Sequence, residues 1–251
     1  MHKILANTVF LGKDLQILTD CHSTNETALS LVRSGKATEG TVVLALNQSG
    51  GKGQRGRQWH AAAGMNLTFS FILMPTFIPV NQQFVLNMAI ALGVYQGLSR
   101  FVSGIAIKWP NDFLYEGRRK LGGMLLENRV RGRQLELQVA GIGINVNQLK
   151  FPVPQAISLA AISGSSFSLD EVLTAILLSV EDYYLRLKAG EGNAIRAEYL
   201  RHLYQFERWA SYHDGDQFTG MITGVGEDGR LLVRKQNGEE ACYDLKQITF
   251  L

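Results

Sequence analysis

The chain has 251 residues, 46% of them hydrophobic, which fits one large domain with a buried core, alone or with a small second domain. Its formal net charge of +3 at pH 7 is too weak to indicate a nucleic acid or a membrane surface as partner, and no apolar run approaches the ~18 residues of a membrane helix. The cysteines are far apart and no signal peptide is evident, so neither a disulfide framework nor a CxxC zinc site is expected, and the predicted compartment is the cytoplasm.

The first 205 residues predict a mixture of strands and helices. A capping-box pattern at Ser23-Thr24-Asn25-Glu26 predicts the first helix, which should end at Gly35. Later helices are predicted at 82–101, 168–188 and 193–203. Apolar runs predict strands at 15–19, 41–46, 67–73 and 105–109, a hairpin of 121–130 with 134–140, and a separate strand at 142–146.

After about residue 206 the pattern changes to short apolar stretches separated by turns. Strands are predicted at 217–223, 231–235 and 241–245, with turns at Asp214-Gly215, Asp228-Gly229 and Asn237-Gly238. This spacing is typical of a small β-barrel or sandwich. We therefore expect an α+β body over residues 1–205 and a small all-β domain over residues 206–251.

A long segment of the body excludes acidic residues. Residues 40–111 contain no Asp or Glu, although the chain carries 22 acids. The segment also holds a set of cations, several of them in the glycine-rich loop 50–57: Lys52, Arg55, Arg57, Arg100 and Lys108. Backbone amides and cations in such a loop form a nest for an anion. The first acid to return, Asp112, stands beside Asn111, where a metal-bound phosphate needs a carboxylate.

The glycine loop does not match the common nucleotide-binding loops. Gly51, Gly53 and Gly56 fit the spacing GxGxxG, but no apolar helix begins after Gly56 and no acid follows about 20 residues downstream. No glycine-lysine pair followed by Ser or Thr completes a Walker A loop. An ordinary solvated turn remains the alternative to an anion site.

Glycines mark two further places where something approaches the backbone closely. Lys120 is followed by Leu121-Gly122-Gly123, and paired glycines inside a strand indicate close contact with a backbone or ligand. Glycine alternates with isoleucine at 141–144, which favours a strand against which a flat group packs. The structural alternatives are a turn at Pro110-Asn111, a surface charge at Lys120, a packed strand at 141–147 and a simple helix cap at Ser23.

Taken in order along the chain, these motifs resemble those of the biotin protein ligases. The resemblance rests on Ser23-Thr24-Asn25, the stretch 48–59, Lys108-Trp109-Pro110-Asn111-Asp112, the stretch 120–127 and the glycine-rich stretch 141–147. It implies a catalytic mixed β-sheet packed with helices, of the class II synthetase type, over residues 1–205. It further implies an SH3-like β-barrel over residues 206–251.

The resemblance also implies an activity and its substrates. Such a ligase activates biotin with ATP and Mg²⁺ as biotinyl-5′-AMP. It then transfers the biotinyl group to a lysine of the biotin carboxyl carrier domain of acetyl-CoA carboxylase, which is the expected partner. Neither a nucleic acid nor a membrane is expected as a partner, and the chain should be a monomer or a homodimer.

Site residues follow from the resemblance position by position. Lys120, Arg55 and Lys108 are expected to act in catalysis, with Lys120 bridging the biotin carboxylate and the α-phosphate. The expected biotin contacts are Ser23, Thr24, Asn25, Gln48, Gly51, Lys52, Gly53, Gln54, Lys120 and Gly123. The expected ATP contacts are Arg55, Arg57, Trp59, Lys108, Asn111, Asp112 and Asn145, and Asp112 is also the expected Mg²⁺ ligand.

Two features depart from the family pattern. The loop commonly has an arginine where this chain has Gln54, which lacks the charged fork of an arginine, so Gln54→Arg is predicted to slow release of the adenylate. The 22 residues before Ser23 are too few for the helix-turn-helix that some members carry, so a ligase without DNA binding is expected.

Two alternative functions stay open. A lipoate-type ligase or acyltransferase shares the general fold, but its arginine pair with triple glycine and its Val-x-His-Asp pattern are absent. A nucleic-acid-binding module would use the basic loop and the small β domain. Acids interrupt any basic stripe in that domain: Glu227, Asp228, Glu239 and Glu240.

Overall fold

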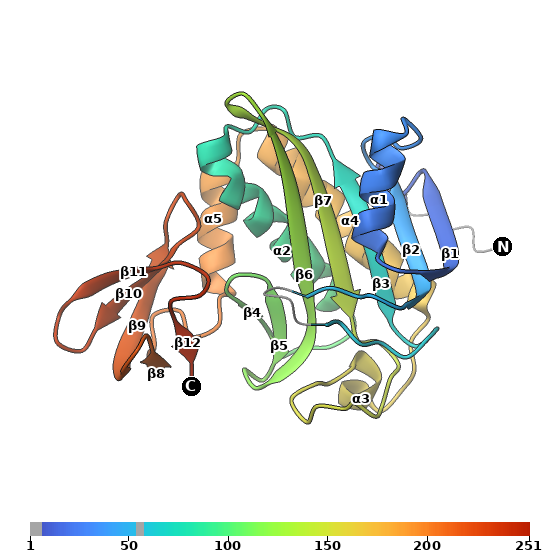
Figure 1. Cartoon of the computed structure of the whole chain (residues 1–251). Helices are drawn as coiled ribbons and strands as arrows, with labels where there is room; N and C mark the ends of the chain where they lie inside the picture. Colours follow the sequence, from blue (N-terminus) through green and yellow to red (C-terminus); the bar gives the residue numbers. More distant parts are fainter. Residues whose placement is uncertain (1–6, 54–57) are drawn as a thin grey trace.

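The structure, a computed structural model, describes residues 7–53 and 58–251 and contains two β-sheets (Figure 1). The larger sheet has the order β1-β2-β3-β7-β6-β5-β4. Its strands are β1 (Leu15–Cys21), β2 (Val42–Gln48), β3 (Leu67–Leu73), β4 (Ile105–Lys108), β5 (Asp112–Tyr115), β6 (Arg119–Arg131) and β7 (Gln134–Ile144). Strands β1 and β2 are parallel and the remaining pairs are antiparallel, so the expected mixed sheet is confirmed.

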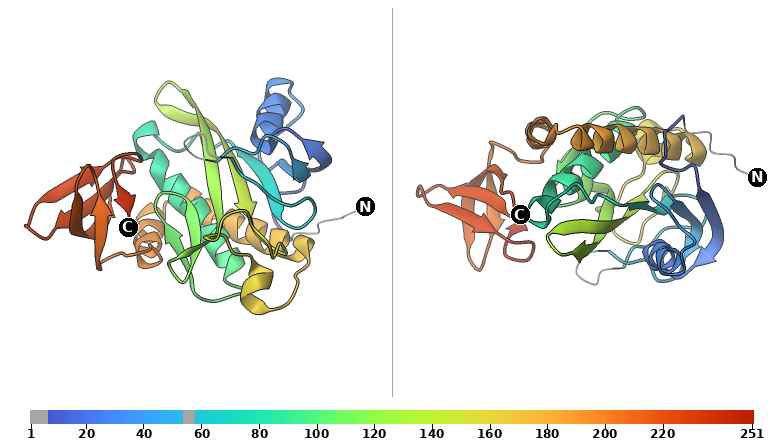
Figure 2. Two further views of the ribbon diagram at one scale, coloured as in Figure 1. Left: turned by 60° about the horizontal axis from the view of Figure 1, so that its bottom comes forward. Right: turned by 90° about the horizontal axis from the view of Figure 1, so that it is seen from above.

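Helices cover both faces of this sheet. Viewed from above, α4 (Leu169–Lys188) and α5 (Gly192–Arg201) run along one side, and α1 (Thr24–Arg33) lies on the other (Figure 2). Strand β3 shows the consequence, since all of its residues are buried. Phe69 and Phe71 point into the main core, whereas Ile72 joins a smaller cluster beneath α1. Ser70 shares that second face, which brings a polar side chain to the start of α1.

Helix α2 (Gln83–Leu98) is apolar around most of its circumference because it is enclosed against α4. Gly93 and Gly97 permit the contact. A Cβ added to Gly93 would lie 2.5 Å from the Cα of Val180, and one added to Gly97 would lie 2.7 Å from the Cα of Ile176. The short helix α3 (Leu159–Ser163) follows β7. No helix in the described part of the chain has both the length and the hydrophobicity needed to span a bilayer.

The C-terminal sheet contains β8 (Trp209–His213), β9 (Gln217–Val225), β10 (Leu231–Lys235), β11 (Glu240–Tyr243) and β12 (Thr249–Phe250). The pairs are antiparallel in the order β11-β10-β9-β8-β12. The small all-β region is therefore confirmed, but the expected closed barrel is not found. Within the described residues β11 and β12 form the two edges of an open sheet.

Hydrogen bonds attach this small sheet to the body. The Trp109 Nε1–H donates to the carbonyl of Gly229 at 2.9 Å, and Arg196 donates to the carbonyl of Val225 at 2.8 Å. Trp109 is itself buried, as expected for a core residue. The anchor point follows directly after β4, so the small sheet lies beside the Lys108–Asp112 motif.

Several sequence predictions of local structure were wrong. β7 runs without a break from Gln134 to Ile144, where a hairpin strand and a separate strand were expected. β5, β8 and β12 were not predicted. Ser23 precedes α1, but its side chain makes no capping hydrogen bond. The Thr24 N–H, the first of the helix, donates to Gln48 Oε1 at 2.8 Å, because β2 brings that side chain to the start of the helix.

Candidate active site

A cavity of about 670 Å³ opens where the start of α1, the central strands, the loop after β7 and the last residues of the chain meet. It gathers most of the described residues that the sequence singled out: Ser23, Thr24, Asn25, Gln48, Lys52, Gly53, Trp59, Lys108, Asn111, Asp112, Lys120, Gly123 and Asn145. Gly51 is buried behind the lining, where an added Cβ would lie 2.6 Å from Gln48 Nε2. The predicted residues Gln54, Arg55 and Arg57 lie outside the described residues.

One end of the cavity carries a fixed polar network. Ser70 Oγ lies 2.7 Å from Thr24 Oγ1 and 2.6 Å from Asn25 Oδ1. The Asn25 amide donates to Glu127 Oε2 at 2.6 Å and to the carbonyl of Leu125 at 3.2 Å. Thr24 and Asn25 are both buried, so these bonds hold their side chains in one orientation.

The alternating glycines of β7 form the surface on which two of these groups rest. A Cβ at position 141 would lie 2.2 Å from Asn25 Oδ1, and one at position 143 would lie 2.5 Å from Trp59 Cε2. The predicted flat group against this strand is therefore confirmed, and it is the Trp59 indole. The indole Nε1–H is buried without a hydrogen-bond partner among the described residues. A buried donor in a cavity wall is a group that a ligand can satisfy.

An ion pair marks the charged part of the cavity. Lys120 Nζ lies 2.7 Å from Asp112 Oδ1, with the two side chains 41% and 33% exposed. Gly123 leaves room for this pair, because an added Cβ would lie 2.8 Å from the same carboxylate oxygen. The backbone of Lys120 is fixed by the loop after β7, through its N–H to Gln155 and its carbonyl to Ile157. The ammonium is thus held at the cavity wall while remaining accessible to a ligand.

Two asparagines in the motifs support this geometry through the backbone. The Asn111 side-chain amide donates to the carbonyl of Met124. The backbone N–H of Met124 donates to the carbonyl of Asn111 at 2.9 Å. The Asn145 amide donates to the carbonyl of Ile157 at 3.1 Å, next to the carbonyl of Lys120. Both side chains are buried. Their amide nitrogens therefore stabilise the strands that present Asp112 and Lys120.

An ion pair links the described beginning of the glycine loop to α1. Lys52 Nζ lies 2.5 Å from Glu26 Oε1. The hydrogen bond to Lys52 lowers the pKa of Glu26, and the same contact raises the pKa of Lys52. Lys52 also pairs with Gln58 across the loop. This pairing places the described part of the loop at the edge of the cavity.

The sequence did not reveal two contributors to the cavity wall. One is the loop after β7, with Phe151, Pro152, Val153, Gln155 and Ala156, and the other is the chain end, with Ile248, Thr249 and Phe250. Pro152 and Pro154 indicated the loop, but no local pattern connected it to Lys120. The chain end lies more than 100 residues from the motifs it meets.

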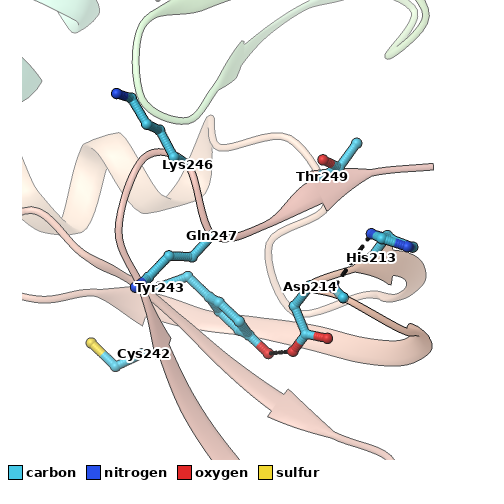
Figure 3. Close-up of a pocket in the computed structure, with 8 residues that line it drawn as sticks. His213, Asp214, Cys242, Tyr243, Lys246, Gln247 and Thr249 are labelled. Carbon is cyan, nitrogen blue, oxygen red and sulfur yellow. Dashed lines mark hydrogen bonds between the residues drawn. The ribbon is translucent and has the colours of Figure 1, made fainter.

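A second hollow, of about 490 Å³, lies on the C-terminal sheet (Figure 3). The carboxylate of Asp214 in this hollow already has partners within the protein. The Tyr243 hydroxyl donates to Asp214 Oδ2 at 2.6 Å, and Lys235 Nζ lies 3.2 Å from the same oxygen. The bond from Tyr243 lowers the pKa of Asp214, and burial raises the pKa of Tyr243 to about 12. None of the expected site residues lines this hollow, so the larger cavity is the candidate active site.

Comparison with known proteins agrees with this geometry. The model of the biotin/lipoate A/B protein ligase family matches residues 18–145, which carry all the motifs except the last two residues of the stretch 141–147. The chain belongs to this family. The bifunctional ligase/repressor BirA of Bacillus spizizenii is 31% identical over 94% of this chain and 74% of its own length. The biotin–[acetyl-CoA-carboxylase] ligase of Paracoccus denitrificans is 28% identical over 89% of this chain and 95% of its own length.

A solved structure agrees as well. The biotin protein ligase from Aquifex aeolicus in complex with biotin and ATP has a TM-score of 0.77 and 25% identity, covering 95% of this chain and 99% of that one. The resemblance to biotin protein ligases is therefore confirmed, and this member of the family is an enzyme of the biotin protein ligase type.

Proposed function

We propose that the chain activates biotin with ATP as biotinyl-5′-adenylate and transfers the biotinyl group to a lysine of the biotin carboxyl carrier domain of acetyl-CoA carboxylase. The observation that carries the proposal is the position of the Lys120 ammonium. It stands in one cavity with the Thr24–Asn25 polar network and with Asp112. A carboxylate substrate and a phosphate can meet there beside a fixed cation.

The polar network favours biotin over lipoate. The ureido ring of biotin offers N–H donors and a carbonyl acceptor, whereas the dithiolane ring of lipoate offers neither. Ser23, Thr24, Asn25 and Gln48 supply hydroxyl and amide groups at one end of the cavity. Internal bonds already use part of the capacity of Thr24 and Asn25. Any remaining donor or acceptor that meets an apolar ring loses its bond to water, which is costly, so this end of the cavity favours the ureido ring.

In the first step a biotin carboxylate oxygen attacks the α-phosphorus of ATP. A carbon–oxygen–phosphorus anhydride forms, the bond to the β-phosphate breaks, and pyrophosphate leaves. Negative charge is concentrated where the two anions approach each other. The Lys120 ammonium stabilises this charge because it is already in place and needs little reorganisation.

In the second step the lysine amine of the carrier domain attacks the carbonyl carbon of the anhydride. An amide bond forms, the amine loses a proton, and AMP leaves. The indole of Trp59 packs on the glycines of β7, and both form part of the cavity wall. Exclusion of water protects the anhydride from hydrolysis before the acceptor arrives.

The donor set fits a magnesium ion bound together with ATP. Among the described residues that line the cavity, Asp112 is the one acid, and no three His, Cys, Asp or Glu side chains of the described chain come together as a metal site. Mg²⁺ is commonly held by one or two carboxylates with substrate phosphates. Asp112 would hold it in this way, and the ion would neutralise part of the phosphate charge.

The test uses a purified biotin carboxyl carrier domain with MgATP and either biotin or lipoate. We expect one biotinyl group on the carrier, detected by intact mass, and none on a carrier whose acceptor lysine is replaced by arginine. Attachment of lipoate with no attachment of biotin would move the chain to the lipoate ligases. A folded chain that labels the carrier with neither acid would refute the proposal.

A further inference from the structure

The last strand of the C-terminal sheet reaches the candidate active site. Ile248, Thr249 and Phe250 line the larger cavity, although the rest of their sheet does not. Strand β12 is fixed there by its pairing with β8, in which Phe250 stands opposite Tyr212, and by the N–H of Leu251, which donates to Ser211 at 3.1 Å. Thr249 also borders the second hollow (Figure 3).

The Phe250 ring lies against a cation of the site. Lys108 Nζ is 4.7 Å from the centroid of this ring. The ring is itself held by two aromatic neighbours, stacked on Tyr204 at 6.2 Å and edge-on to Tyr212 at 5.3 Å between centroids. A ring packed in this way offers the ammonium a fixed electron-rich face.

Lys108 lies at the charged part of the cavity. It is the last residue of β4, and its register partner on β5 is Asp112, whose carboxylate meets Lys120. Both lysines are therefore neighbours of Asp112, Lys108 as its partner in the strand pairing and Lys120 through the ion pair. This is the part of the cavity where the proposed function needs cations for the phosphates of ATP.

We propose that Phe250 is a positioning residue that holds the Lys108 ammonium toward the phosphates of ATP, so that the C-terminal sheet completes the nucleotide site. The inference rests on the proposed function. A lysine ammonium stands on a flexible stem of about four carbons, and restricting this stem costs conformational entropy when a ligand binds. A contact that restricts it beforehand lowers that cost, and the benefit appears in ATP affinity.

The proposal predicts a change in one kinetic constant. Phe250→Leu keeps an apolar side chain but removes the ring face. We expect the KM for ATP to rise about threefold to tenfold, the effect of losing one cation–π contact at a half-buried position. The KM for biotin should stay the same, because the polar network around Asn25 is at the other end of the cavity. Phe250→Tyr keeps a ring and should retain the wild-type KM for ATP.

The chain offers a matched control in the same sheet. Lys235 Nζ lies 4.9 Å from the centroid of the Phe218 ring, a contact of the same kind that lines neither cavity. Phe218→Leu should therefore leave the KM for ATP unchanged, even if it lowers thermal stability as much as Phe250→Leu does. An equal rise in both variants would show a general loss of sheet packing and would overturn the proposal.

A double-mutant cycle tests whether Phe250 acts through Lys108. The rate of biotin-dependent adenylate formation and the affinity for a non-hydrolysable ATP analogue are measured for Phe250→Leu, Lys108→Met and the double variant. We expect Phe250→Leu to have no further effect once Lys108 is gone. Additive effects would overturn the inference alone. So would an unchanged KM for ATP in Phe250→Leu, provided that the wild-type chain makes adenylate. A wild-type chain that binds the analogue and makes no adenylate would instead refute the proposed function.

Discussion

Replacing Lys120 with alanine should remove catalysis and leave the fold intact. The side chains of the Lys120–Asp112 pair are 41% and 33% exposed, so solvent screens their attraction. Ion pairs of this exposure contribute about 0.2 to 1 kcal/mol to stability. The backbone of Lys120 keeps its bonds to Gln155 and Ile157 whatever its side chain is. We expect the melting temperature to fall by no more than about 4 °C in a chain of this size.

The effect on the reaction should be far larger. Removal of one preplaced group that stabilises developing charge costs about 10²-fold to 10³-fold in rate. The rate of biotinyl-5′-adenylate formation from biotin and MgATP should fall by this factor in Lys120→Ala. It is measured by mass spectrometry of the quenched mixture, with circular dichroism to follow the fold.

A second ion pair on the same strand provides the control. Arg129 on β6 lies 2.8 Å from Glu136, with side chains 51% and 31% exposed, and neither residue lines the cavity. Arg129→Ala should match Lys120→Ala in stability and retain the full rate. Near-normal adenylate formation by folded Lys120→Ala would refute the role given to this ammonium.

Three further predictions concern other parts of the chain. Gly143→Ala should displace the Trp59 indole, which would lie 2.5 Å from the new Cβ, and lower the adenylation rate; an unchanged rate would show that this packing is not needed. Gln54→Arg should slow escape of the adenylate in a chase experiment, and unchanged release would contradict the sequence argument. Burial lowers the pKa of His202, so stability should be present above the ordinary histidine pKa of about 6.5 and be lost as pH falls below it. His202→Gln should flatten that fall in melting temperature, and an equally steep fall would exclude His202 as its cause.

Local patterns in the sequence predicted the elements whose ends are determined locally. Ser168 caps α4 through the N–H of Glu171, as the capping pattern indicated, and β10 has the predicted bounds. The pattern at Ser23 is equally clear, yet the Ser23 side chain makes no capping bond, and Gln48 on β2 accepts from the first N–H of the helix. A long-range contact can therefore take part in hydrogen bonding at a helix start where the local pattern predicts a cap alone.

Many of the residues that line the candidate cavity were named from the sequence, but the long-range contacts among them were not predictable. The glycines at 141 and 143 indicated a flat neighbour without indicating that it was Trp59. The turn formers Pro110 and Asn111 concealed the start of β5 at Asp112, since a strand of only four residues has little periodicity. Phe250 escaped prediction because its contact with Lys108 depends on how the small sheet docks, which no local pattern encodes.

The most direct test of the central claim is incubation of the purified chain with biotin and MgATP in the absence of any acceptor, with lipoate in a parallel tube. The account predicts biotinyl-5′-adenylate and pyrophosphate by mass spectrometry in the biotin tube. Lipoyl-adenylate with no biotin product, or neither adenylate from a folded sample, would contradict it.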